Sequence, residues 1–172
     1  MSKKIAVLLT DLFEDSEYTS PAEELKKAGH ELVTIEKEAG NVVKGKQGDA
    51  EVTIDKGIDD TKPEEYDALL IPGGFSPDKL RADDRFLEFV RHFDQEKKPI
   101  FTICHGPQLM INAKIVEGKK MTSVKQVGID LINAGAKWED SELVIDESGL
   151  ITSRTPDDLP VFNKAIVEAL EK

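Results

Sequence analysis

The chain of 172 residues is long enough for one domain that buries a sizeable core. Hydrophobic residues make up 39% of it and charged residues 33%, with no low-complexity tract, which excludes a disordered protein. The formal net charge of −11 is spread along the chain, so nucleic acids and anionic membrane surfaces should be repelled and neither is expected as a partner.

No apolar run is long enough to cross a bilayer, and no signal-peptide pattern follows the first residues, so we expect a cytoplasmic protein. The single cysteine, Cys104, cannot form an intrachain disulfide and is expected as a free thiol. The histidines share no short ligand spacing with each other or with Cys104, and we therefore expect no metal and no cofactor.

The first part of the chain alternates strand and helix signals. Residues 4–10 (KIAVLLT) predict a strand that is buried on both faces of a sheet. Ser20-Pro21-Ala22-Glu23 predicts a helix with Ser20 as its N-cap, which ends at Gly29. Residues 32–35 predict a second strand, and the glycine-rich, charged segment 41–55 predicts an exposed hairpin.

The alternation continues through the rest of the chain. Buried strands are predicted at residues 68–71 and 100–103, with an amphipathic helix around Phe86 to Phe93 between them. The remaining predicted elements are helices at 108–113 and 127–134, short strands at 143–145 and 150–152, and a final helix that begins at Asp157 and Asp158. The pattern predicts one α/β domain, residues 1–172, with a mostly parallel central sheet and helices on both faces.

Cys104 lies where the strand at 100–103 gives way to a helix. A lone cysteine after a strand is usually a small buried hydrophobe. A sharp turn at a helix start also offers free backbone N–H groups, which would favour the thiolate and make Cys104 a nucleophile. The turn resembles the nucleophile elbow of G-x-S-x-G hydrolases, with Gly106 and, as an imperfect match, Thr102 at the small-residue positions.

A second loop should meet this turn, because Pro72-Gly73-Gly74 also follows the carboxyl end of a parallel strand. The glycine pair Gly73-Gly74 is either a simple tight turn or part of an oxyanion hole, in which backbone N–H groups of Gly74 and His105 hold an oxygen bonded to Cys104. The His105 imidazole is either the general base or points away from the thiol, as neighbouring side chains on a turn often do.

Glu14 follows the first strand at the same edge of the sheet. Its spacing alone is that of a solvated loop acid. If Glu14 faces the thiol, burial and the nearby negative charge would raise its pKa and allow it to donate a hydrogen bond to the sulfur.

Five motifs occur along the chain: Phe13-Glu14-Asp15, residues 67–74 (DALLIPGG), residues 103–108 (ICHGPQ), residues 132–136 (INAGA) and residues 152–156 (TSRTP). Together they resemble the PfpI family of intracellular cysteine hydrolases, within the class I glutamine amidotransferase-like superfamily that includes the parkinsonism-associated protein deglycase. The resemblance implies a flavodoxin-like three-layer sandwich, Cys104 as nucleophile, His105 beside it, and Glu14 as the carboxyl that hydrogen-bonds the sulfur.

The resemblance also implies self-association. The stretch Pro77-Asp78-Lys79-Leu80-Arg81 would by itself be a solvated face. In PfpI-type oligomers an acid at the position of Asp78 reaches the histidine of the neighbouring subunit, here His105. The family has glutamate at this position, so Asp78 predicts a looser contact, with a homodimer expected and a hexamer as the alternative. Val124 departs from relatives that carry tyrosine or histidine there.

Together with the position of Cys104, the resemblance implies a stress-associated hydrolase that uses Cys104 against peptides or against aldehyde-modified proteins, in the manner of a cysteine peptidase or of a deglycase or glyoxalase. The alternative from another class is a non-enzymatic redox sensor or holdase that works by oxidation of Cys104.

Overall fold

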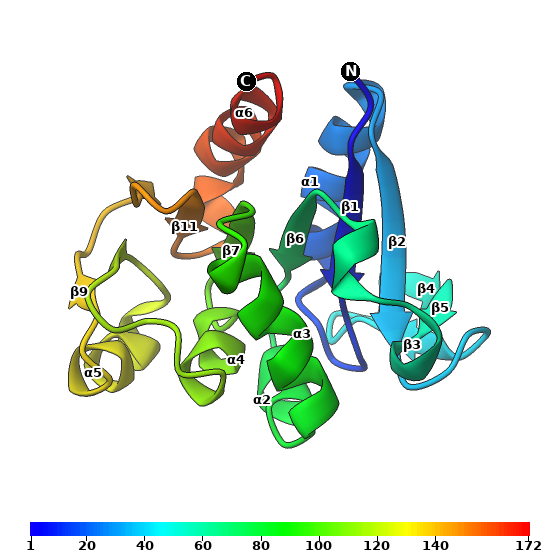
Figure 1. Cartoon of the computed structure of the whole chain (residues 1–172), viewed down its shortest axis with the longest axis horizontal. Coiled ribbons are helices and arrows are strands. Elements are labelled where there is room, and N and C mark those ends of the chain that lie inside the picture. Colours follow the sequence, from blue (N-terminus) through cyan, green and yellow to red (C-terminus); the bar gives the residue numbers. More distant parts are fainter.

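The computed structural model describes residues 1–172 and is built around a seven-stranded sheet of order β10-β11-β7-β6-β1-β2-β5 (Figure 1). Its strands are β1 (Lys4–Leu8), β2 (Glu31–Glu36), β5 (Lys56–Gly57), β6 (Ala68–Ile71), β7 (Ile100–Ile103), β10 (Val144–Ile145) and β11 (Leu150–Ser153). All neighbours pair in parallel except the edge strand β10, which is antiparallel to β11. The predicted mostly parallel sheet is confirmed.

Helices cover both faces of the sheet, because its strands are apolar on both sides. Ile5 and Val7 of β1 pack into one buried cluster with α1 and α6, whereas Ala6 and Leu8 pack into the opposite cluster with α3 and α4. The helices are α1 (Asp15–Lys27), α2 (Ser76–Leu80), α3 (Asp84–Gln95), α4 (Pro107–Asn112), α5 (Lys125–Asn133) and α6 (Leu159–Leu170). Short 3₁₀ turns lie between β5 and β6, at Ile58–Asp60 and Pro63–Glu65, and before α6, at Pro156–Asp158. The predicted three-layer, flavodoxin-like sandwich is confirmed, and none of its helices is both long and apolar enough to span a membrane.

Two small sheets lie outside the main one. The segment 41–55 forms the predicted hairpin, in which β3 (Val42–Lys44) pairs antiparallel with β4 (Glu51–Thr53). The other pair is β8 (Lys120–Met121) with β9 (Lys137–Trp138), which run parallel. Strands β6 and β7 begin and end at the residues that the sequence predicted.

The first helix is the element that the sequence placed wrongly. Helix α1 begins at Asp15, so Ser20 and Pro21 lie inside it and Ser20 does not act as its N-cap. The Ser20 hydroxyl instead accepts a hydrogen bond of 2.8 Å from Asn163 Nδ2 on α6, which ties the two helices of this face together. The earlier start places Glu17 within the first turn of α1, on the side of the helix that is buried.

Candidate active site

The loops after β1 and β6 meet at one edge of the sheet. The order of the strands reverses at β1, which has β2 on one side and β6 on the other, and open α/β sheets bind ligands at such a point. Glu14 N–H donates to the Gly73 carbonyl at 3.2 Å, and Phe75 N–H donates to the Leu12 carbonyl at 2.8 Å. A Cβ added at Gly73 would lie 3.0 Å from Cys104 Cβ, so the loop after β7 reaches the same place, as the sequence predicted.

Cys104 occupies a strained turn between β7 and α4. Its φ is +62°, in the left-handed region that costs a residue with a Cβ about 1–2 kcal/mol. Two backbone hydrogen bonds of 3.1 Å hold this conformation, from Cys104 N–H to the Ser153 carbonyl and from Val124 N–H to the Cys104 carbonyl. This is the geometry of a nucleophile elbow.

The two positions of the elbow where small residues are expected, Thr102 and Gly106, pack against each other. A Cβ on Gly106 would collide with Thr102 Oγ1 and come within 2.8 Å of the Ile71 carbonyl. Thr102 Oγ1 donates to that carbonyl at 2.9 Å, so its hydroxyl occupies the space that glycine leaves open. Thr102 therefore suits this elbow, although it is not the small residue expected there.

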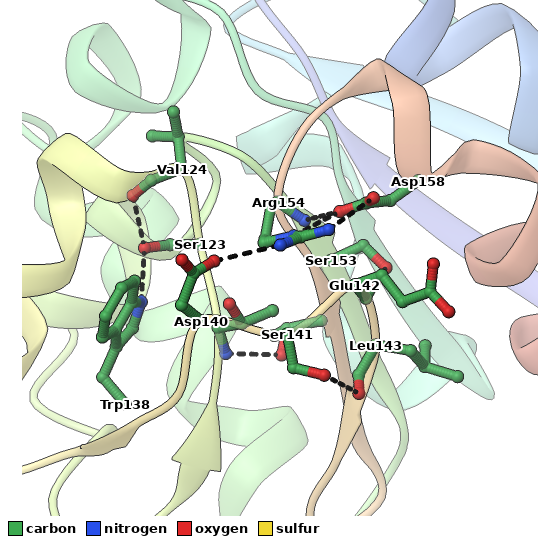
Figure 2. Close-up of polar contacts among 12 residues, drawn as sticks. Ser123, Val124, Trp138, Asp140, Ser141, Glu142, Leu143, Ser153, Arg154 and Asp158 are labelled. Carbon is green, nitrogen blue, oxygen red and sulfur yellow. Dashed lines mark hydrogen bonds and ion pairs between the residues drawn. The ribbon is translucent and has the colours of Figure 1, made fainter.

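The segments that hold the elbow are themselves cross-linked (Figure 2). Next to Ser153, the Arg154 guanidinium contacts Asp158 through Nε at 3.0 Å and Asp140 through Nη1 at 3.0 Å. On the Val124 side, Trp138 Nε1 donates to Ser123 Oγ at 3.0 Å, and Ser123 Oγ donates to the Val124 carbonyl at 2.8 Å.

The imidazole of His105 lies against the thiol. Cys104 Sγ and His105 Nδ1 are 3.2 Å apart, so the two neighbouring side chains meet on this turn. Burial lowers the pKa of His105, and the positive charge of Lys46 lowers it further, so the ring is neutral at pH 7. A neutral imidazole at this distance is able to accept the proton of the thiol.

Glu17 is the acid that the fold places beside the sulfur. Its side chain is fully buried in the first turn of α1, and Oε1 accepts the Gly73 N–H at 3.0 Å. Burial, followed by the charge of Glu14, raises the pKa of Glu17 to about 8, so the carboxyl is mostly protonated at pH 7. Oε2 is buried without a hydrogen-bond partner, and the Cys104 thiol is close enough that it and the carboxyl act on each other's pKa.

The expectation that Glu14 hydrogen-bonds the sulfur is not met. Glu14 Oε2 lies 3.0 Å from Lys46 Nζ, and Glu14 Oε1 lies 3.3 Å from Gln47 Nε2. Because α1 begins at Asp15, Glu14 flanks the helix, whereas Glu17 lies one turn further and points into the interior. The acids Asp15 and Glu17 after the first strand are a sequence signal for a helix start that the Ser20-Pro21 pattern outweighed.

The backbone donors also differ from the expectation. The Gly73 N–H is occupied by Glu17 and is not free to hold an oxyanion. Gly74, with φ of +79°, has an N–H that donates to no backbone carbonyl. The backbone N–H of His105 lies close enough to the sulfur to lower the pKa of the Cys104 thiol.

The resting thiol is neutral, contrary to the expectation that the helix start favours the thiolate. Burial raises the pKa of Cys104, whose residue is 8% exposed, and the charge of Glu17 raises it further. The N–H of His105 and the charge of Lys46 act in the opposite direction but do not outweigh burial.

Asp78 and Val124 complete the set of residues that the sequence singled out. Asp78 lies in α2, half exposed, with its Oδ1 2.7 Å from Nη2 of Arg81 in the same helical turn. Its charge raises the pKa of His105 in the same chain, against the larger effects of burial and Lys46. No group of three or more histidine, cysteine or acidic side chains is arranged to hold a metal ion.

These features define an α/β sandwich with a cysteine on a nucleophile elbow, a histidine in contact with it and a buried, protonated glutamate alongside. The chain belongs to the DJ-1/PfpI family, whose sequence model matches residues 3–169.

Curated relatives match along their whole length. The chain is 61% identical over 170 residues to Protein/nucleic acid deglycase 2 of Escherichia coli, covering 99% of each chain. It is 60% identical over 172 residues to General stress protein 18 of Bacillus subtilis, covering 100% of each. It is 53% identical over 171 residues to the protein named "Putative cysteine protease YraA" of B. subtilis, covering 99% of this chain and 100% of that one.

Solved structures show the same fold. A two-domain protein of Anabaena variabilis with DJ-1/ThiJ/PfpI-like and ferritin-like domains superposes with a TM-score of 0.95 at 37% identity, covering 98% of this chain and 48% of that one. Drosophila melanogaster DJ-1beta superposes with a TM-score of 0.89 at 24% identity, covering 98% of this chain and 90% of that one.

Proposed function

We propose that this protein is a cysteine-dependent hydrolase that removes aldehyde-derived adducts from proteins, with Cys104 as the nucleophile. The observation that carries the proposal is the 3.2 Å contact between Cys104 Sγ and His105 Nδ1 on a strained elbow. Support comes from relatives that bear the names deglycase and general stress protein at 61% and 60% identity.

Each side chain of the site has a defined task in this proposal. The thiol proton moves to the neutral Nδ1 of His105, which leaves an imidazolium beside a thiolate. Glu17 keeps its own proton at pH 7 and donates it as a hydrogen bond to the sulfur, because Oε1 is already engaged by Gly73. The N–H of Gly74 is the donor available to a developing oxyanion.

On a hemithioacetal adduct the proposed reaction has two displacement steps. The thiolate forms a bond to the carbon that carries the hydroxyl, and the bond from that carbon to the substrate sulfur breaks. The departing sulfur takes the proton from the His105 imidazolium and leaves as a thiol. Water next displaces the Cys104 sulfur from the same carbon, so that the aldehyde leaves as its hydrate and Cys104 regains its proton.

The depth of the thiol favours a small reacting group. Cys104 is 8% exposed, so the tip of a modified side chain reaches the sulfur more readily than an extended peptide does. Peptide hydrolysis is the competing activity, and it is supported by the relative named as a cysteine protease. In that reaction the amine would leave with the imidazolium proton, and water would hydrolyse the resulting thioester.

The test is a pair of assays on the same preparation. We expect hydrolysis of the methylglyoxal adduct of N-acetylcysteine, followed with a trap for free aldehyde that removes buffer-catalysed reversal, and little cleavage of unmodified casein. Cys104→Ser should abolish turnover without changing the unfolding midpoint. Full activity in Cys104→Ser would refute the proposal, and cleavage of casein alone would assign the site to peptides.

The redox alternative is tested in parallel. Oxidation by peroxide requires the thiolate, and burial raises the pKa of Cys104, so we expect slow and unselective oxidation at pH 7. Rapid conversion of Cys104 to sulfinic acid by stoichiometric peroxide, seen by mass spectrometry, would favour the sensor.

We also propose that the protein assembles as a homodimer through the face that carries Asp78. Phe75 and Leu12 are 57% and 40% exposed next to the site, which is apolar surface that a second subunit would cover. Light scattering should give the mass of a dimer, with a hexamer as the other closed assembly. Mixing inactive Cys104→Ser and Asp78→Ala subunits should restore part of the activity, whereas a monomer would overturn this proposal.

A further inference from the structure

The turn of the β3–β4 hairpin is fastened to the start of α1. The buried carboxylate of Asp15 accepts N–H groups from Gln47 and Ala50, both at 2.8 Å. Gly45 packs so closely on that carboxylate that a Cβ there would collide with it. Lys46 N–H donates to the Phe13 carbonyl at 2.9 Å. The backbone of Lys46 is therefore fixed beside the loop that carries Glu14.

The side chain of Lys46 is directed towards the two loops that meet beside Cys104, those after β1 and β6. Its Nζ lies 3.0 Å from Glu14 Oε2 and 5.5 Å from the centre of the Phe75 ring. The Lys46 side chain is 34% exposed and that of Glu14 only 13%, so the pair is partly shielded from water. A charge in such a position acts on its neighbours more strongly than a fully solvated one.

Several elements bring ionisable groups to Cys104, and they differ in charge at pH 7. Glu17 and His105 are neutral, because the pKa of Glu17 is raised to about 8 and that of His105 is lowered. Asp78 is paired with Arg81. On the β11 side the adjacent Ser153 does not ionise, and the next residue, Arg154, is held by Asp140 and Asp158 (Figure 2). The pair of Glu14 and Lys46 supplies the remaining charges.

We propose that Lys46 is a positioning residue that stabilises the Cys104 thiolate electrostatically, and that the adjacent carboxylate of Glu14 offsets part of this effect. The charge of Lys46 lowers the pKa of both Cys104 and His105, in agreement with this geometry. This inference rests on the proposed function only in one respect: a stabilised thiolate matters for turnover only if Cys104 is the nucleophile of a hydrolase. Ionisation of the thiol is measurable in a protein that turns over no substrate.

The experiment is the rate of alkylation of Cys104 by iodoacetamide between pH 6 and 10, in the full chain. Burial holds the thiol pKa above its ordinary value, so in this range each unit of change in the pKa alters the rate about tenfold, and the variants are compared by their rates at the same pH. Lys46→Met removes a positive charge that lowers the pKa of the thiol, so it should raise the apparent pKa by roughly half a unit and slow alkylation about threefold at each pH. Lys46→Arg keeps the charge and should stay near the wild-type value. Glu14→Gln removes the offsetting charge and should lower the apparent pKa.

A matched control lies in the same hairpin. Lys44 pairs with Glu51 at 3.5 Å on the surface, with its side chain 68% exposed, so Lys44→Met makes the same change in net charge away from the thiol. It should leave the profile unchanged. An unchanged or lowered pKa in Lys46→Met, or an equal shift in Lys44→Met, would overturn the proposal. A raised pKa in Glu14→Gln would overturn the role given to Glu14.

The two proposals fail separately. If Cys104→Ser keeps its turnover while Lys46→Met still raises the thiol pKa, the proposed hydrolase is wrong and the role of Lys46 stands. If wild type and Lys46→Met have identical alkylation profiles while turnover depends on Cys104, the role given to Lys46 is wrong and the proposed hydrolase stands.

Discussion

Replacement of Glu17 by glutamine tests how the protein holds a protonated carboxyl in its interior. The pKa of Glu17 is raised from an ordinary 4.5 to about 8, with burial as the main cause. Because one pKa unit corresponds to about 1.4 kcal/mol, this difference amounts to about 5 kcal/mol. The free energy of unfolding of the wild type is therefore highest below pH 4.5, falls as the pH rises towards 8 and stays constant above that. At pH 7 it is about 3 kcal/mol lower than below pH 4.5.

Glutamine does not ionise, and its oxygen is able to accept the Gly73 N–H as Oε1 does now. Its amide would be buried with imperfect partners, at a cost of about 1 kcal/mol. We therefore expect Glu17→Gln to raise the free energy of unfolding by about 2 kcal/mol at pH 7. This is a measurable part of the 5–15 kcal/mol typical of a domain.

The assay is urea unfolding of both proteins at intervals from pH 4.5 to 8.5. The difference between wild type and Glu17→Gln should grow with pH up to about 8 and then level off. Glu24→Gln is the control on the same helix, because Glu24 is 45% exposed and contacts only Lys27 at 3.5 Å among charged groups. A constant difference across this range, or the same slope in Glu24→Gln, would refute a protonated Glu17.

Three further substitutions probe the supports of the site. Gly106→Ala should lower the free energy of unfolding by about 2–3 kcal/mol, because the added Cβ collides with Thr102 Oγ1. Adding Thr102→Ala removes that oxygen and should recover part of the lost stability. An unchanged thermal unfolding midpoint in Gly106→Ala would contradict this. Asp15→Asn should lower the free energy of unfolding by about 2 kcal/mol at pH 7 and expose the hairpin to limited proteolysis, because the Asp15 carboxylate accepts backbone N–H groups of the hairpin turn. Burial raises the pKa of Asp15, but these N–H groups together lower it below its ordinary value, so the carboxylate stabilises the fold at neutral pH and loses this effect only in acid. Equal proteolysis of both proteins would count against it. Arg154→Met should lower the urea midpoint, because Asp158, whose side chain is 5% exposed, then keeps only the backbone N–H of residue 154 at 2.9 Å. An unchanged midpoint would mean that the ion pair is dispensable.

The sequence by itself determined the central strands of the sheet and the place of Cys104, the candidate nucleophile. Strands β6 and β7 are short apolar runs bounded by glycine, proline or a turn, so residues next to each strand in the sequence indicate where it begins and ends. Gly106 after Cys104 signals an elbow because only a residue without a Cβ fits beside Thr102 and Ile71. The meeting of the loops after β6 and β7 follows from parallel pairing alone.

Tertiary structure decided which acid serves the site. Ser20-Pro21 is a strong local signal for a helix start, yet α1 begins earlier because Asp15 binds the hairpin turn and Ser20 contacts Asn163 on α6. That earlier start turns Glu17 inwards and leaves Glu14 to pair with Lys46, a partner supplied by another part of the chain.

The protonation of the site was likewise beyond the sequence. A cysteine at a helix start suggests a thiolate, but its pKa depends on how much water the surrounding layers exclude and on which charges they bring near. Here burial outweighs the local N–H groups and raises the pKa of Cys104, and it raises that of Glu17 to about 8. Local patterns specify where a side chain leaves the backbone, whereas solvent exclusion and long-range charges arise only when distant segments pack together.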